Sequence, residues 1–274
     1  MSAPPATHRG VTSLLAALIA GSVGCALVPG VPAGPIRSPG VRAGLTYAYA
    51  YGRASARVTQ PSGEPTTVRG NGAMFNGLFP LLPLRAMLRA SPAPFVDVGV
   101  DWGWTDAALQ LRAGPLDAHR RWPWGIELEG RTGRFSPFQT GVRDVRVLRG
   151  RAELYPALGR VGQMDGFGVL TLGASRGTSF HQLFVPSEFD EVQEGPIPTA
   201  IEVSRVETRL EASLGVHGRV PRAAFTIVLQ PWFMLAQGAP RDAACTGCSL
   251  VLEQLDAPWG VALLASGSLV WDRD

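Results

Sequence analysis

The segment RVETRLEASLGV, residues 205–216, alternates between two kinds of side chain. Most of the positions between the polar ones hold apolar residues, and the polar positions are Arg205, Glu207, Arg209, Glu211 and Ser213. Because successive side chains of a β-strand point to opposite faces of the sheet, this pattern predicts a strand with one dry face. The other face carries two full charges of each sign, and few sheets can accommodate such a face.

The same alternation recurs along the chain after residue 43 and predicts an all-β fold. The 33 Gly and 23 Pro favour turns over long helices. An alternative for residues 79–90, FPLLPLRAMLRA, is a short helix inserted between two strands. The ten predicted strands are 45–59, 65–75, 95–104, 107–113, 124–131, 143–156, 166–179, 200–217, 222–236 and 259–271.

The charged positions allow two structures. In a soluble sandwich the polar face of each strand meets water, whereas in a membrane barrel it lines the interior. The run 200–217 is longer than the usual globular strand of about 5–6 residues, and a tilted strand needs about 9–11 residues to cross a bilayer. We therefore expect opposite charges to form an ion network in the lumen. Its predicted members are Asp97, Asp101, Glu127, Glu129, Arg131, Arg149, Arg151, Glu153, Arg205, Glu207, Arg209 and Glu211. Ordinary charge pairs on a solvated face remain the alternative.

Loop lengths favour the barrel. The two long connections 181–199 and 238–258 fall at one end of a ten-stranded barrel, and the short connection 218–222 between them falls at the other. In these respects residues 44–274 resemble the class of small outer-membrane barrels. The resemblance implies an antiparallel up-and-down β-barrel of 8–10 strands, with ten favoured, in contact with membrane lipid and with a lumen filled by side chains.

The N-terminus has the pattern of an export signal. His8 and Arg9 precede a largely apolar stretch, VTSLLAALIAGSVG. Because a membrane-spanning helix needs about 20 apolar residues, this stretch is too short to be one, but it fits the core of a signal peptide. We therefore interpret residues 1–25 as a signal peptide, which ends at Cys25.

The residues around Cys25 resemble the lipobox of bacterial lipoproteins. Val23 and Gly24 are small residues before the cysteine, although Ser22 stands where that motif usually has Leu. The resemblance implies that Cys25 is lipidated, and Ala26, in place of an Asp, implies the outer membrane. An ordinary secretory signal with an incidental Cys25 is the alternative, and both predict export.

Residues 26–43, ALVPGVPAGPIRSPGVRA, are rich in Pro and Gly and have no periodicity. We expect them to form an extended tether between the signal peptide and a barrel domain at 44–274.

Two further motifs carry possible chemistry. Cys245 and Cys248 form CTGC in a predicted outer loop, and in an exported chain a local disulfide is expected in preference to a redox or metal site. Ser179 and His181 share one face of a predicted strand end and would be the nucleophile and base of a lipid-modifying hydrolase. The acidic loop between residues 181 and 199 matches no calcium-binding spacing, so we expect a solvated loop.

These patterns predict an outer-membrane barrel with a structural, adhesive or envelope-complex role. The outer loops 181–199 and 238–258 would contact other envelope proteins. We expect no enzymatic activity and no cofactor or metal. All 25 basic residues are Arg, and they form no basic run, so no nucleic-acid partner is expected. The alternatives are a lipid-tethered soluble barrel that binds a small apolar ligand or lipid and, third, the hydrolase.

Overall fold

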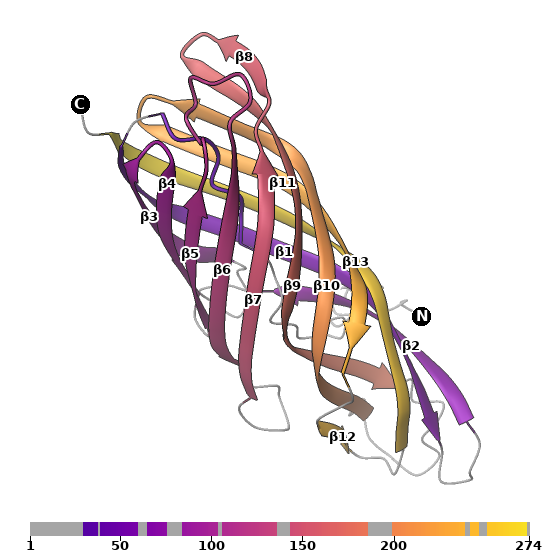
Figure 1. Ribbon diagram of the computed structural model, residues 1–274. Coiled ribbons are helices and arrows are strands. Elements are labelled where there is room, and N and C mark those ends of the chain that lie inside the picture. The colour runs from indigo at the N-terminus through magenta and orange to yellow at the C-terminus, as the bar shows by residue number, and fades with distance from the viewer. Residues whose placement is uncertain are drawn as a thin grey trace, which may run out of the picture.

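The computed structural model describes residues 30–37, 39–59, 65–75, 84–103, 106–135, 143–185, 199–238, 242–246 and 251–272. These residues form one antiparallel sheet and no helix (Figure 1). The strands are β1 (Gly40–Thr59), β2 (Pro65–Phe75), β3 (Leu84–Ala93), β4 (Val96–Trp102), β5 (Asp106–Ala113), β6 (Trp124–Phe135), β7 (Arg143–Leu154), β8 (Ala157–Val161), β9 (Met164–Val185), β10 (Thr199–Val220), β11 (Ala223–Gln237), β12 (Asp242–Thr246) and β13 (Val251–Asp272).

The sheet closes on itself. β1 pairs with β13 on one side and with β3 on the other, and β9 pairs with both β7 and β10. The barrel therefore runs β1-β3-β4-β5-β6-β7-β9-β10-β11-β13 and returns to β1, which makes ten strands. The predicted all-β antiparallel barrel, with ten strands favoured, is confirmed.

Three short strands extend this barrel instead of widening it. β2 and β3 both pair with β1, along its second half and its first half respectively, so they share one position in the barrel. In the same way β12 continues the line of β11 along β10, and β8 continues the line of β7 along β9.

The alternative of a short helix near 79–90 is wrong for residues 84–90, which belong to β3. Residues 79–83 lie outside the described ranges. Buried and exposed side chains alternate along β3, and two inward arginines, Arg85 and Arg89, pair with carboxylates of β4. Ion pairing with the neighbouring strand thus accompanies the strand conformation in a sequence of good helix formers.

The two ends of the barrel differ. At the end that we call the turn end, β3 joins β4 through residues 94–95 and β10 joins β11 through residues 221–222. The β8–β9 hairpin also lies there, at the top of Figure 1. The opposite end, the loop end, holds the connections from β9 to β10 and from β11 to β13.

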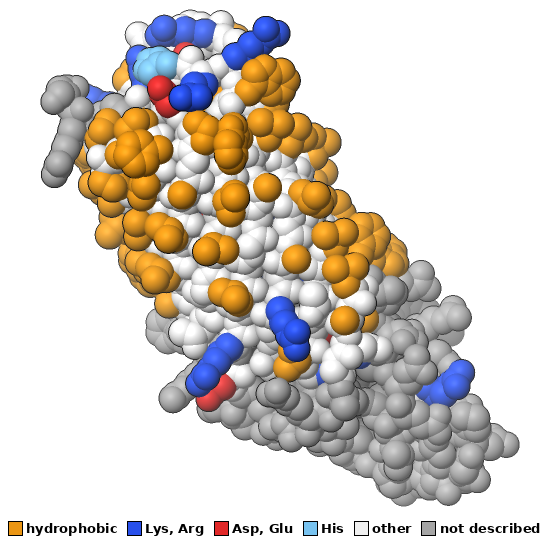
Figure 2. Space-filling view, in the orientation of Figure 1, with side chains coloured by type: hydrophobic (Ala, Val, Ile, Leu, Met, Phe, Trp, Pro, Cys, Tyr) orange, Lys and Arg blue, Asp and Glu red, His pale blue; other side chains and the backbone are white. Residues whose placement is uncertain are grey.

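The burial pattern is that of an inside-out protein. On β10, Glu207 is 0% exposed and Leu214 is 67% exposed, and the charged alternate positions are buried throughout residues 205–211. The charged face of the segment RVETRLEASLGV therefore lines the lumen and its apolar face points outward. Figure 2 shows the result on one face of the barrel, a broad zone of hydrophobic side chains with charged side chains beyond it. This inversion is the architecture of membrane-spanning barrels, whereas a soluble barrel keeps its apolar side chains inside.

Tryptophans mark the height of the band. Trp271 and Trp259 are both exposed on β13, one near the turn end and the other toward the loop end. The 12 residues from position 259 to position 271, at about 3.3 Å each and a tilt of about 40°, cover roughly 30 Å along the barrel axis. That height matches the hydrocarbon core of a bilayer, and aromatic residues at both interfaces are typical of such barrels. The described part of the chain contains no helix long and apolar enough to cross a membrane.

We predict that Leu214→Arg destabilises the barrel in a bilayer by about 2–4 kcal/mol, because the substitution places a charge in the hydrocarbon. Leu214 aligns with Leu229 and, through it, with Leu263, between the two tryptophan levels of β13. Equilibrium unfolding in urea from short-chain lipid vesicles would measure the change. The control is Leu158→Arg on β8, beyond the barrel rim, which should change the stability by less than about 1 kcal/mol. Equal effects of the two variants would contradict a lipid-facing band.

Candidate functional site

The lumen is the most elaborate polar site that the structure describes. All twelve residues of the predicted ion network lie on inward-facing positions and are buried. The structure adds inward residues that the sequence analysis did not select, namely Arg42, Arg85, Arg89, Asp106, Gln110, Arg112, Ser175, His217, Arg219 and Gln230. The missed arginines lie in the segments interpreted as a tether, as a short strand, as an alternative helix or as the short connection 218–222, where the alternation was too brief to recognise.

Asp97 on β4 is a centre of the network. Its carboxylate accepts hydrogen bonds from Arg42 at 3.0 Å, Arg89 at 3.1 Å and Arg112 at 2.9 Å. The hydroxyl of Ser91 donates to its other oxygen at 3.0 Å. Three guanidinium groups around one carboxylate leave an excess of positive charge. Glu153 offsets part of this excess, because its carboxylate lies 2.8 Å from Arg112.

A second centre is Glu129 on β6. It accepts hydrogen bonds from Gln110 at 2.8 Å and from Arg131 at 3.2 Å, and it pairs with Arg149. Arg149 in turn donates to Glu211 of β10 at 2.7 Å. These contacts join β5, β6, β7 and β10 across the lumen, so the network ties strands together that are not all neighbours in the sheet.

Toward the loop end, a smaller group surrounds Glu207, which pairs with Arg205 and with Arg209, each at 2.7 Å. The guanidinium of Arg209 lies 4.0 Å from the ring centre of Trp232, a cation–π contact inside the barrel. The Glu207 carboxylate is thus paired within the wall itself.

Residues 30–36 also lie inside the barrel, and we call them the N-terminal plug. Three arginines of the wall donate hydrogen bonds to its backbone carbonyls. Arg151 reaches the oxygen of Gly30 at 2.7 Å, Arg42 that of Ala33 at 2.7 Å, and Arg112 that of Gly34 at 2.9 Å. Because only backbone oxygens are used, the side chains of the plug need no charge.

The plug is fixed at the turn end. The amide of Ile36 donates to the carbonyl of Leu116 at 2.8 Å, and the amide of Ala118 donates to the carbonyl of Ile36 at 2.7 Å. Ile36 is 1% exposed and packs in an apolar cluster that includes Leu116, Tyr155 and Phe167. Hydrogen bonds and apolar packing together hold this stretch in one position.

The predicted tether at 26–43 is therefore wrong for its described part. Residues 30–36 form no strand, but they lie in the lumen, and β1 already begins at Gly40. A pattern of Pro and Gly without periodicity contains no information about what the backbone contacts.

Tyr155, in the connection after β7, closes one side of this end. Its hydroxyl donates to Glu153 at 2.8 Å, and its ring lies 5.7 Å from the guanidinium carbon of Arg112. Burial and the neighbouring Glu153 carboxylate raise the pKa of Tyr155 well above its usual range. The side chain is therefore a neutral hydrogen-bond donor.

The predicted outer loops are shorter than expected. Residues 181–185 continue β9, residue 199 begins β10, and residues 251–258 belong to β13. Because these strands extend beyond the hydrophobic band, the loop end is partly sheet. The alternation there is interrupted by Pro and acidic residues, which led to the prediction of long loops.

Other predicted residues are only partly placed. Ser179 and His181 lie on β9 in register with Arg205 and Val203, and their side chains are outside the described part. Cys245 lies on β12 opposite Ile201, whereas Cys248 is outside the described ranges, so the disulfide stays a prediction. The signal peptide 1–25 and the lipidation of Cys25 also lie outside them. Among the described residues, no group of three or more His, Cys, Asp or Glu is arranged to hold a metal ion.

Comparisons with known proteins find likeness only in structure. No family model and no curated protein matches the sequence. The chain is similar in fold to the outer membrane protease OmpT from Escherichia coli, with a TM-score of 0.37 and 9% identity over 85% of this chain and 96% of that one. It is also similar to the beta domain of the Bordetella autotransporter BrkA, with a TM-score of 0.17 and 7% identity over 81% of this chain and 98% of that one.

The structure thus defines a barrel of the outer-membrane type, with an apolar exterior and a lumen filled by charge pairs and by its own N-terminal plug. The reading of the chain as a soluble barrel with an apolar cavity does not fit, because the described lumen is lined by arginines and carboxylates.

We predict that Glu129→Gln destabilises the barrel by about 3 kcal/mol, since Arg131 and Arg149 each lose one buried carboxylate and retain Asp106 and Glu211 as partners. Urea unfolding in lipid vesicles would measure the loss. The matched control is Glu129→Gln combined with Arg149→Gln, which removes one of the two cations that lose Glu129 and should recover part of the stability. Additive losses in the double variant would show that the two side chains do not form a buried pair.

We predict that Gly34→Val displaces the plug. Gly34 has φ of +76°, which a β-branched residue rarely adopts, and a Cβ there would fall on the imidazole of His217. The reporter is Ala33→Cys in a variant without the three native cysteines. Its labelling by a water-soluble thiol reagent should become about tenfold faster or more, because a factor of ten corresponds to a loss of ~1.4 kcal/mol in the free energy that holds the plug in place. Gly130→Ala is the control, because a Cβ at Gly130 meets nothing within 4 Å. Unchanged labelling in Gly34→Val would contradict the position of the plug.

Proposed function

We propose that the protein is a bacterial outer-membrane barrel with a lumen closed to solute flow and a structural, adhesive or envelope-complex role. The single observation that carries the proposal is that both wall side chains and the N-terminal plug fill the lumen. Wall side chains form ion pairs across it, and the N-terminal plug occupies space that those side chains leave. A barrel filled in this way is suited to act through its ends and not through a pore.

The physical reason for the plug lies in the number of strands. In barrels of about eight strands, inward side chains are enough to fill the interior, and the diameter increases with strand number. Ten strands leave more room along the axis, and the N-terminal plug occupies part of it. Its three carbonyl oxygens also accept hydrogen bonds from the buried guanidinium groups of Arg151, Arg42 and Arg112 and so stabilise their positive charge.

The outer membrane as location is supported by the lipid-facing band and by the export pattern of the sequence. Lipidation at Cys25 is part of the same proposal and rests on the lipobox-like residues. The contact surface would be the loop end, where β9, β10 and β13 extend past the hydrophobic band. The short strand β12 pairs with β10 at this end. No observation on the described residues favours the hydrolase over this role.

The proposal predicts that the purified protein in a planar lipid bilayer shows no stable ion conductance. Deletion of residues 30–36 should raise the conductance by about tenfold or more, because removal of the plug leaves a polar, solvated path along the axis. The control is Leu214→Ala, which changes the lipid face alone and should leave the barrel closed. Resistance of each sample to unfolding on an unheated gel would show that the barrel is intact.

A stable, pore-sized conductance of the unmodified protein would overturn the proposal of a closed lumen. If the deletion variant folds and remains as closed as the unmodified protein, the side chains alone seal the barrel. In that case the plug has no part in the closure, and the role assigned to it here is wrong.

A further inference from the structure

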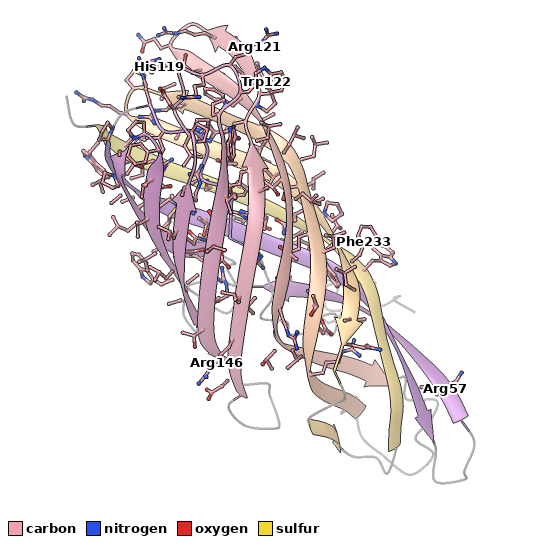
Figure 3. The ribbon with its side chains drawn as sticks, viewed as in Figure 1. Arg57, His119, Arg121, Trp122, Arg146 and Phe233 are labelled. Atoms are coloured by element: carbon pink, nitrogen blue, oxygen red, sulfur yellow. The ribbon has the colours of Figure 1, made fainter. Side chains whose placement is uncertain are left out.

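A second site lies outside the lumen, at the turn end. A cavity of about 420 Å³ opens there between three parts of the chain, namely the residue that follows the plug, the connection from β5 to β6, and the β8–β9 hairpin. We call it the basic pocket. The residues that matter for the argument are Arg37, Arg120, Arg121, Arg160, Asp165 and Phe167. Figure 3 shows Arg121 and His119 of its rim at the upper end, beside β8.

The basic pocket has an excess of positive charge. Its lining includes four arginines and one carboxylate, Asp165. The Asp165 carboxylate lies 3.8 Å from Arg37 and 3.6 Å from Arg160, and these groups are all partly exposed. Such distances exceed hydrogen-bond length, and exposed pairs of this kind contribute little. Asp165 therefore holds two guanidinium groups near each other without neutralising the site.

The two remaining arginines are adjacent in the chain and exposed. Within the described ranges, neither Arg120 nor Arg121 has an ion pair with a carboxylate. The carboxylate of the nearby Asp117 accepts a hydrogen bond from the backbone amide of His119 at 2.9 Å. That contact shapes the turn, and it directs the acidic group to the backbone.

Backbone hydrogen bonds hold the walls of the pocket in place. The amide of Ala157 at the start of β8 donates to the carbonyl of Arg121 at 3.1 Å, and the amide of Tyr155 donates to that of Pro123 at 2.8 Å. The amide of Arg120 donates to the carbonyl of Asp117 at 3.1 Å. Because the arginines project from fixed backbone, little ordering is needed before a ligand binds.

The height of the pocket relative to the membrane is set by its neighbours. Trp122 and Trp124, just after Arg121, are 52% and 48% exposed. Tryptophans on the outside of a membrane barrel lie at the level of the lipid headgroups. The guanidinium groups of Arg120 and Arg121 thus lie at or just beyond the headgroup level, where phosphate groups are abundant.

We propose that the basic pocket binds a phosphate group. Guanidinium forks match phosphate oxygens in geometry and charge, and several arginines from separate elements converge on a site of suitable size. This inference goes beyond the proposed function, since it concerns the turn end and holds whether or not the lumen conducts. Two sources supply the same chemistry at this level, the headgroup of an anionic phospholipid and a soluble phosphate compound.

The experiment uses the full chain in a non-ionic detergent, in phosphate-free buffer. Calorimetric titration with inorganic phosphate tests the soluble source, and retention of phosphatidylglycerol over phosphatidylcholine in native mass spectrometry tests the lipid source. The test variant is Arg120→Gln combined with Arg121→Gln. The matched control is Arg57→Gln combined with Arg146→Gln, which removes the same charge from exposed positions at the loop end (Figure 3).

We expect binding by one of the two probes, weakened by about tenfold or more in the test variant because two charge-assisted contacts are lost, and unchanged in the control. Asp165→Asn should bind more tightly, since a competing carboxylate is removed. A purely structural role of these residues does not predict that gain.

Retention of phosphatidylglycerol alone would assign the pocket to a lipid headgroup, and binding of inorganic phosphate alone to a soluble compound. Absence of binding by both probes would overturn the proposal. An equal loss of binding in the loop-end control would also overturn the proposal, because the loss would then depend on the net charge of the protein and not on the basic pocket.

Discussion

The structure depends on paired charge in a place without bulk water. A guanidinium or carboxylate on the inner wall costs several kcal/mol to desolvate, and the cost is offset only when each group finds partners of opposite charge in good geometry. Asp97 with its three arginines and Glu129 with its three donors meet that condition. Because most of the inward charged groups of the described strands are paired inside, the outward half of these strands is free to be apolar, and lipid becomes the solvent that the outer face requires.

Most of the fold was predictable from the sequence because the alternation is strict where the strands are regular. Residues 124–131 and 205–216 show a charged or small residue at every second position, and the structure buries that face. Residues 84–93 were harder, since Leu, Met, Ala and Arg also favour helix and only the carboxylates on the neighbouring β4 reveal Arg85 and Arg89 as strand residues. These carboxylates lie on another strand, so the local periodicity of residues 84–93 does not reveal them.

The two sites outside the regular strands were not predictable for a related reason. The plug is bound through the carbonyls of Gly30, Ala33 and Gly34, and a carbonyl is present at every residue, so no side-chain pattern indicates it. The basic pocket draws its arginines from positions 37, 120–121 and 160, which come together only when the hairpin β8–β9 folds over the rim. In both cases the sequence contains the groups and the topology makes the site.

The position of the plug also constrains how the molecule is assembled. β1 follows the plug almost directly, and β1 completes the cylinder by pairing with β13, the strand farthest along the described chain. The β1–β13 seam therefore joins the two ends of the described sheet, and it closes around a segment of the same chain. A barrel that closed this seam with residues 30–36 outside would have to admit them through the turn end, where Ile36 bonds to Leu116, before the arginines of the wall reached their carbonyls. Because the plug and the seam adjoin along the chain, closing the barrel and filling its interior are linked steps.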